Sequence, residues 1–139
     1  MAKKKFKILI VASDFYSNIT SKMIISAEEE LKKNKCSFDI LRVNGSLEIP
    51  TMIAIKLKKN KYDGAIALGC IIKGQTNHNE VIANTIATSL VNISVENLKP
   101  VGNAVLSCNN LTQALARTKG WKNRPAEAVK AIISVLDNI

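Results

Sequence analysis

Residues 65–78 of this 139-residue chain are AIALGCIIKGQTNH, running from Ala65 to His78. The first eight form a nearly unbroken apolar run, typical of a strand that is buried on both faces of a parallel sheet. Gly74 ends the run in a short polar loop, and the only histidine of the chain follows at a predicted helix start. Backbone N–H groups at a helix start bind anions, and a histidine transfers protons near neutral pH. An α/β enzyme is therefore the first hypothesis.

The same succession of apolar strand and amphipathic helix extends over the whole chain. It predicts strands at residues 6–11, 37–43, 65–72 and 101–107, and helices at about 18–34, 50–60, 77–93, 110–118 and 126–137. Ser17 or Asn18 is expected to cap the first helix. Strands that alternate with helices imply a parallel sheet covered on both faces, and right-handed crossovers restrict its winding. We predict an α/β, flavodoxin-like three-layer sandwich with strand order 2-1-3-4, in a single domain over residues 1–139.

The composition restricts the class of protein. Apolar residues make up 47% of the chain, but no apolar run reaches the roughly 18 residues that a membrane span requires. The net charge of +9 raises the question of nucleic-acid binding. The lysines are dispersed over the predicted helices and have no aromatic residues between them, which favours solvated helix faces. We therefore expect a cytoplasmic protein that binds neither nucleic acid nor membrane.

The three cysteines, Cys36, Cys70 and Cys108, lie far apart in the sequence. Without a CxxC pair, a zinc site is not expected. A disulfide framework is not expected either in a cytoplasmic α/β protein of this size. Cys70 and Cys108 fall near predicted strand ends, where small buried apolar side chains are the usual interpretation. A nucleophilic cysteine is the minor alternative.

Polar and aromatic residues gather where the predicted strands end. Ligands of doubly wound sheets bind outside these carboxyl ends. Phe15 follows the first strand and can stack on a ring. Glu48 lies in the segment Gly45–Pro50 after the second strand, and Arg117 near the end of a late helix could clamp a phosphate from a neighbouring subunit. The alternatives are an ordinary helix-terminal acid and an ordinary helix-terminal cation.

Taken together, these segments resemble the 6,7-dimethyl-8-ribityllumazine synthase family over nearly the whole chain. The resemblance rests on the order and spacing of Phe15 with Ile19-Thr20, the run 45–50 (GSLEIP), the run 62–78, Asn84, and Gln113 with Arg117. It implies an enzyme of the penultimate step of riboflavin synthesis. That enzyme joins 5-amino-6-(D-ribitylamino)uracil to 3,4-dihydroxy-2-butanone 4-phosphate and needs no metal or organic cofactor.

The resemblance also implies a role for each candidate residue. Phe15 would stack on the pyrimidine, and His78 would carry protons. The side chains that hold the pyrimidine and its ribityl chain would be Ser46, Leu47, Glu48, Cys70, Ile71 and Ile72. The phosphate would be held by Gln75 and Thr76, together with Arg117 of the adjacent subunit. Asn103 would line the site from the neighbour, where the family often has an aromatic residue.

A site shared between subunits implies a homo-oligomer, either a homopentamer or a hollow shell built from pentamers. Riboflavin synthase is a candidate partner on the same grounds. Three other functions stay open at this point. They are a flavin- or nucleotide-binding module without catalysis, a basic nucleic-acid-binding or shell-forming structural protein, and a family member that has lost its activity.

Overall fold

The computed structural model describes residues 6–74 and 78–139 of the chain. The strands are β1 (Lys7–Ser13), β2 (Ser37–Val43), β3 (Gly64–Ile72) and β4 (Val101–Cys108). The α-helices are α1 (Ser17–Lys33), α2 (Ile49–Lys59), α3 (His78–Asn97), α4 (Leu111–Ala116) and α5 (Arg124–Leu136). Two 3-10 turns, η1 (Ser46–Glu48) and η2 (Gly120–Lys122), were not expected from the sequence.

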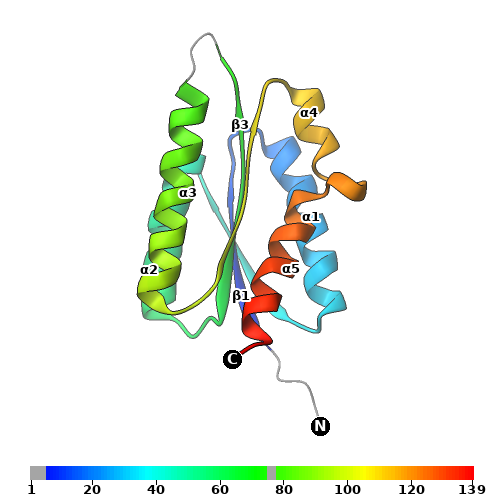
Figure 1. Ribbon diagram of the computed structural model, residues 1–139. Coiled ribbons are helices and arrows are strands. Elements are labelled where there is room, and N and C mark those ends of the chain that lie inside the picture. Colours follow the sequence, from blue (N-terminus) through cyan, green and yellow to red (C-terminus); the bar gives the residue numbers. More distant parts are fainter. Residues whose placement is uncertain (1–5, 75–77) are drawn as a thin grey trace.

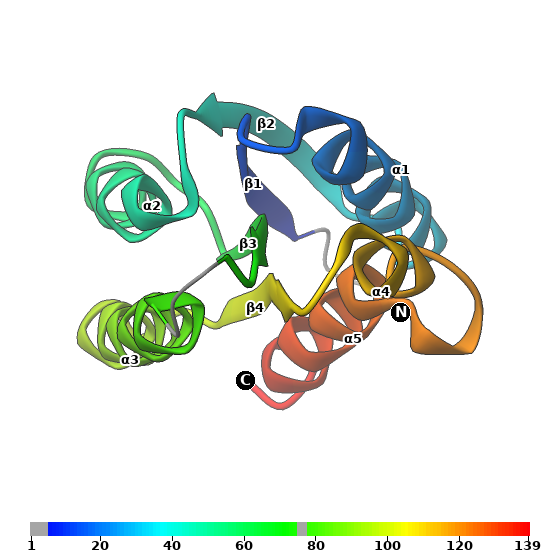
Figure 2. The same cartoon turned by 90° about the horizontal axis from the view of Figure 1, so that it is seen from above.

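The four strands form one parallel sheet in the order β2-β1-β3-β4. Helices α2 and α3 cover one face of this sheet, and α1, α4 and α5 cover the other (Figures 1 and 2). The predicted three-layer, flavodoxin-like sandwich with strand order 2-1-3-4 is therefore confirmed. All four strands point the same way, so their carboxyl ends meet at one edge of the sheet (top of Figure 1).

The central strands are buried on both faces, as their apolar runs predict. In β1, Ile8 and Ile10 pack in the cluster with α1 and α5, while Leu9 and Val11 pack in the cluster with α2 and α3. All four side chains are fully buried. Each such burial contributes about 1.5–3 kcal/mol to folding, so β1 and β3 form a firm platform for the loops at their ends.

The start of α1 differs from the prediction. Neither Ser17 nor Asn18 caps the helix; the N-cap is Tyr16, which has left-handed backbone angles and no side-chain cap. The Tyr16 carbonyl accepts the N–H groups of Ile19 and Thr20 instead. The backbone enters the helix one residue earlier than the sequence suggests, so Ser17 already lies inside its first turn.

The edge strand β2 is covered less than the central strands. Ile40 is exposed, while Leu41 and Val43 pack against the cluster on the α2 side. Because β2 lies at the edge of the sheet, its side chains are only partly covered.

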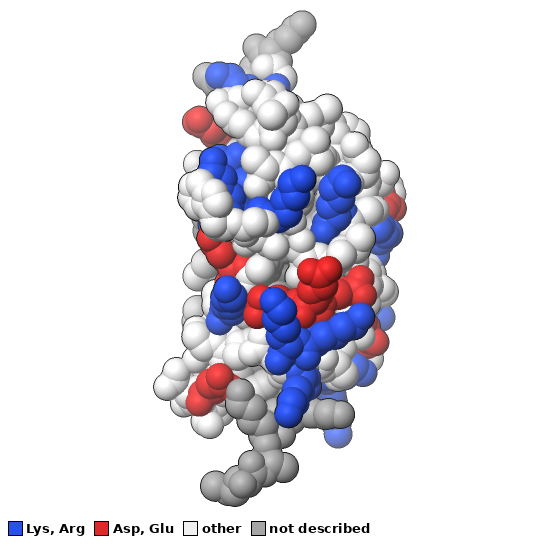
Figure 3. All heavy atoms as spheres, turned by 90° about the vertical axis from the view of Figure 1, so that its right-hand side faces the viewer, with Lys and Arg blue, Asp and Glu red and all other residues white. Residues whose placement is uncertain are grey.

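On the outer side of α1, α4 and α5, basic side chains lie in groups with acidic side chains between them (Figure 3).

Candidate active site

The loops at the carboxyl ends of β1, β2 and β3 enclose a cavity of about 380 Å³ together with α3. Its lining residues are Phe15, Tyr16, Gly45, Ser46, Leu47, Glu48, Cys70, Ile71, Ile72 and Ile82. Seven of these were predicted as pyrimidine-site residues from the sequence, and the structure brings all seven together in one cavity. The lining is mainly apolar with a few polar groups, as is usual for small-molecule sites.

An aromatic pair forms one wall of the cavity. The Phe15 side chain is 63% exposed, and its ring meets Tyr16 edge to face, with centroids 4.7 Å apart. Tyr16 holds a φ of 60°, which is uncommon for a residue with a side chain. Backbone conformations of this kind gather at functional sites, where the surrounding structure compensates their cost. Phe15 is thus presented on a fixed loop with one face free to stack on a planar ligand.

Hydrogen bonds to β2 fix that loop. The N–H of Asp14 donates to the carbonyl of Val43, and the N–H of Phe15 donates to that of Asn44. The Arg42 guanidinium contacts the Asp14 carboxylate at 3.1 Å and the Ser21 hydroxyl at 3.2 Å. The loop after β1 is therefore tied to the end of β2 and to Asn44 directly after it.

The η1 turn forms the opposite wall and is closed by its own acid. Glu48 Oε2 accepts the N–H of Gly45 at 3.0 Å, and the Glu48 N–H donates to the Gly45 carbonyl at 3.2 Å. A Cβ added at Gly45 would lie 2.9 Å from Glu48 Oε2, so any other residue here would require the Glu48 carboxylate to shift. Glu48 is also the N-cap residue of α2, as its predicted helix-terminal position indicates. The same residue lines the cavity.

A second glycine lets η1 pack on the sheet. A Cβ added at Gly69 of β3 would lie 2.6 Å from Ser46 Oγ and 3.3 Å from Ile49 Cδ1. Ser46 is itself buried. The side chain missing at Gly69 therefore makes the space that Ser46 occupies at the cavity wall.

The two cysteines near the strand ends are not poised as nucleophiles. Burial, followed by the neighbouring Cys108, raises the pKa of Cys70 to about 12. Burial also raises the pKa of Cys108, although Arg117 opposes this shift. A thiolate is the reactive form of cysteine, so both groups are inert near neutral pH.

His78 is the first residue of α3 and is exposed to solvent. Ile82 lies one helical turn later and lines the cavity. Residues four apart share one helix face, which places His78 on the side of α3 that borders the cavity mouth. The two other predicted residues of this loop, Gln75 and Thr76, lie outside the described residues.

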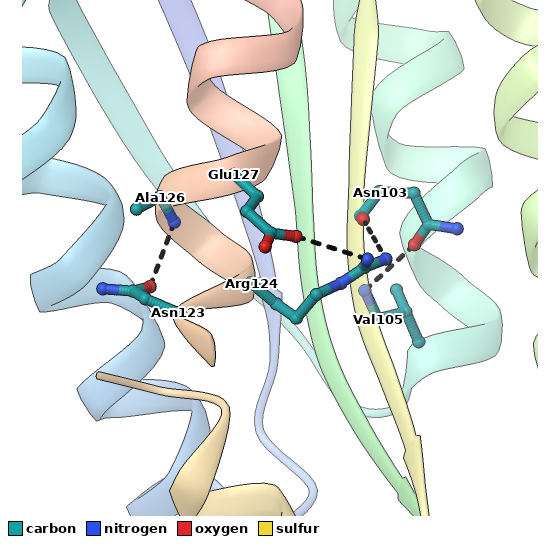
Figure 4. A network of polar contacts seen from close by, with 6 residues as sticks. All are labelled: Asn103, Val105, Asn123, Arg124, Ala126 and Glu127. Atoms are coloured by element: carbon teal, nitrogen blue, oxygen red, sulfur yellow. Dashed lines mark hydrogen bonds and ion pairs between the residues drawn. The ribbon is translucent and has the colours of Figure 1, made fainter. Parts of the chain in front are cut away.

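Asn103 and Arg117 do not line this cavity. Asn103 Oδ1 accepts the N–H of Val105 at 2.9 Å on the edge strand β4, and the Asn103 carbonyl accepts from Arg124 at 3.5 Å (Figure 4). The Arg117 guanidinium donates to the Gln113 carbonyl at 3.1 Å and contacts Cys108 Sγ at 3.5 Å. Within one subunit, these two residues are thus held by their own strand and helix, away from Phe15 and Glu48.

Three further residues line the cavity: Gly45, from the candidate segment Gly45–Pro50, and Tyr16 and Ile82, which were not named as site residues from the sequence. Ile82 could have been found from its four-residue spacing to His78. Tyr16 could not, because its contribution depends on a backbone conformation that its residue type does not favour. Among the described residues, no cluster of three or more His, Cys, Asp or Glu side chains could hold a metal ion. Over the same residues, no helix is long and apolar enough to cross a membrane.

A comparison with protein families identifies the chain. A sequence model described as 6,7-dimethyl-8-ribityllumazine synthase matches residues 5–139. The chain belongs to the lumazine synthase family. The 6,7-dimethyl-8-ribityllumazine synthase of Bartonella henselae is 38% identical over 136 residues, which cover 96% of this chain and 88% of that protein. The 6,7-dimethyl-8-ribityllumazine synthase 1 of Rhodopseudomonas palustris is 37% identical over 136 residues, covering 94% and 83% respectively.

Family membership confirms the resemblance inferred from the sequence. The chain is a lumazine synthase, a transferase of riboflavin biosynthesis, and it shares the fold of that family. Lumazine synthases act on small-molecule substrates and assemble as oligomers.

Proposed function

We propose that the cavity between Phe15 and η1 binds 5-amino-6-(D-ribitylamino)uracil, and that His78 at its mouth moves protons during condensation with 3,4-dihydroxy-2-butanone 4-phosphate. The observation that carries this proposal is a mainly apolar cavity that unites an exposed aromatic ring, the polar η1 turn and the end of β3. The Phe15 ring would stack on the pyrimidine. Ser46 and Glu48 would hydrogen-bond to its polar edge and ribityl chain, while Leu47, Cys70, Ile71 and Ile72 would line the pocket.

The chemistry follows from holding two substrates side by side. The 5-amino group attacks the ketone carbon, and the carbinolamine loses water to give an imine. Proton loss from the carbon skeleton then expels the phosphate as its C–O bond breaks. The resulting enol becomes a second ketone, which the ribitylamino nitrogen attacks, and a second water leaves as the ring closes. Each step needs a proton to be moved, which suits an imidazole. Proximity supplies much of the remaining rate.

The phosphate would lie beside the loop between β3 and α3. Gln75 and Thr76 are proposed to hold it from this subunit, and Arg117 from the neighbour. The position of Arg117 supports a shared site, because this C-cap residue of α4 does not line the cavity of its own subunit. Asn103 of the edge strand would line the neighbour's site in the same way.

Exposed apolar surface on two separate faces supports assembly into a closed ring. Leu47 and Ile55 are exposed along a second hollow, of about 540 Å³, between β2 and α2. Val95, Leu98 and Val135 are exposed on the opposite side, around the ends of α3 and α5. Two different patches that contact each other give a head-to-tail interface, which forms a ring when the rotation closes. We propose that this ring is the pentamer expected from the sequence, alone or within a shell.

We further propose that the enzyme works in the cytoplasm. Cys70 and Cys108 are buried free thiols, as suits a reducing compartment. Riboflavin synthase, which would consume the product, remains a candidate partner of the assembly.

The proposed function is tested by incubating the purified protein with both substrates while following lumazine fluorescence and released phosphate. Formation of both products in equal amounts supports it. Binding of the pyrimidine without phosphate release would show a binding module instead, and absence of both would overturn the assignment. A His78→Ala variant should fold normally but turn over about 10²–10⁴-fold more slowly, as is typical for loss of a general acid–base group.

A further inference from the structure

Asn79, the second residue of α3, is buried although its side chain is polar. It is 8% exposed, and its Nδ2 donates to the hydroxyl of Ser107 on β4 at 3.3 Å. Its Oδ1 is also buried and has no hydrogen-bond partner among the described residues. Among the described residues, the amide is therefore satisfied on one side only, and that side connects the first turn of α3 to the carboxyl end of the edge strand.

This arrangement does not suit a residue chosen for stability. A buried amide oxygen without a partner loses its water and gains nothing in return. An apolar side chain of similar size would fill the same space without this cost. What an apolar side chain cannot supply is the contact with Ser107. The contact itself is therefore the reason for a polar side chain at this position.

Besides Asn79, the first two turns of α3 are held on the sheet mainly by Ile82, which is only partly buried. The buried residues of the helix are Asn79, Ile86, Leu90 and Ile93. Between His78 and Thr85, Asn79 is thus the only buried side chain. Ile82 is partly buried against the core cluster on this face, and fully buried apolar anchoring begins at Ile86, about two turns after His78. The Asn79–Ser107 contact is the polar tie of the first turn, and it helps to set the direction of that turn and the place of the imidazole.

We propose that Asn79 is a positioning residue, which ties the first turn of α3 to Ser107 and so fixes His78 at the mouth of the cavity. This inference rests on the proposed function of His78 as the proton carrier. A misplacement of the reacting group by about 1 Å can reduce a rate about 10²-fold, so a single weak contact at this place has a large effect on turnover.

The test compares three variants with the wild-type enzyme. Asn79→Leu removes the contact and the unpaired oxygen together, Ser107→Ala removes only the contact, and Ser107→Thr retains the hydroxyl. We expect kcat to fall about 10-fold or more in the first two, with KM changed less than about 2-fold, and to stay near wild type in the third. The double variant Asn79→Leu/Ser107→Ala should be no slower than Asn79→Leu alone, since both changes break one contact.

Melting temperature separates positioning from a structural role. Asn79→Leu should melt at or above the wild-type temperature, because it removes an unsatisfied buried group. A variant that melts lower and regains wild-type kcat per folded site would overturn the inference, as would an unchanged kcat in Asn79→Leu. Thr85→Ala is the matched control, since the Thr85 hydroxyl bonds only to Val81 O of its own helix in the described structure, and its loss should leave kcat unchanged.

Hydrogen exchange across residues 78–85 gives a readout that needs no turnover. It should be faster in Ser107→Ala than in the wild type and unchanged in Ser107→Thr. Failure of the wild type to form lumazine would overturn the proposed function alone. An active wild type with unaltered exchange and kcat in Ser107→Ala would overturn only the role of Asn79.

Discussion

Glu48 closes the turn that bears it, because its carboxylate accepts the backbone N–H of Gly45 at 3.0 Å. The same turn carries Ser46 and Leu47 into the cavity wall. One side chain thus contributes a polar group to the site and also holds two neighbouring lining residues in place. Its two effects can be separated, because an amide can still accept the N–H but carries no charge.

Replacing Glu48 therefore tests whether η1 recognises the pyrimidine. Glu48→Ala should raise the KM for the pyrimidine about 10-fold or more, since charge-assisted hydrogen bonds contribute about 1.5–3 kcal/mol. Glu48→Gln should have a smaller effect, because the turn can still close. Steady-state kinetics with the second substrate at saturation measures both changes. Glu96→Ala, at the far end of α3, serves as the control, and equal KM values in all three variants would contradict a role for η1.

Gly69 makes a prediction about stability. In Gly69→Ala, the added Cβ would lie 2.6 Å from Ser46 Oγ, and relieving this overlap should cost about 1–3 kcal/mol of the free energy of unfolding. Urea denaturation measures the change. Gly74→Ala is the matched control, because nothing lies within 4 Å of its added Cβ.

A second substitution shows whether Ser46 causes the loss at Gly69. Ser46→Ala removes the Oγ, and the nearest remaining atoms would then lie 3.3–3.4 Å from the new Cβ. The double variant Gly69→Ala/Ser46→Ala should therefore be more stable than the sum of the single changes predicts. Strict additivity would mean that the two residues do not share the space.

The sequence predicts most of this fold because its signals are local. The run from Ala65 to Ile72 is apolar on both faces, which is typical of a central strand of a parallel sheet. Where packing depends on partners distant in the sequence, prediction fails. Ile40 is an apolar residue of a predicted strand, but it is exposed at the edge of the sheet. How far its side chain is covered depends on elements packed from elsewhere in the chain, and periodicity does not contain this information.

In the site too, residues marked by local sequence signals were predicted, and those that depend on distant contacts were not. Phe15 and Glu48 were predicted because each follows a strand whose end is visible in the sequence. The left-handed Tyr16 between Phe15 and α1 was not, since its residue type gives no signal for positive φ. The contact of Asn79 with Ser107 joins residues 28 positions apart and depends on the register of α3 against β4.

The buried thiol of Cys70 predicts a loss of stability at high pH. Burial raises its pKa from 9.0 to about 12 in the folded chain. Between these values, only the unfolded chain gives up the proton, so the unfolded state gains free energy as the pH rises. The contribution of Cys70 to the free energy of unfolding is fully present below about pH 9 and is lost as the pH rises towards 12. Denaturation in urea at a series of pH values from 8 upward measures this decline.

Two variants show which side chains cause the loss of stability at alkaline pH. Cys70→Ala should make the decline shallower above pH 9. Tyr62→Phe should make the decline in stability shallower above pH 10. The reason is that burial and the hydrogen bond to Asp39 raise the pKa of Tyr62 from 10.0 to about 12. Iodoacetamide at pH 8 should leave Cys70 unmodified in the folded protein. Rapid alkylation there would show an accessible thiolate and contradict the inert thiol inferred from burial.

A site shared between subunits makes the strongest prediction about assembly. His78→Ala and Arg117→Ala should each be nearly inactive, since one lacks the proton carrier and the other the phosphate clamp. If the two side chains serve one site from adjacent subunits, mixed rings contain interfaces at which both are intact. Random mixing at equal amounts should restore about a quarter of the wild-type sites, because each intact site requires a particular order of two neighbours. The variants are unfolded together, refolded and assayed, and each variant refolded alone is the control. No recovery in mixtures that sedimentation shows to be assembled would mean that each subunit completes its own site, and that Arg117 acts only where it lies, against Cys108.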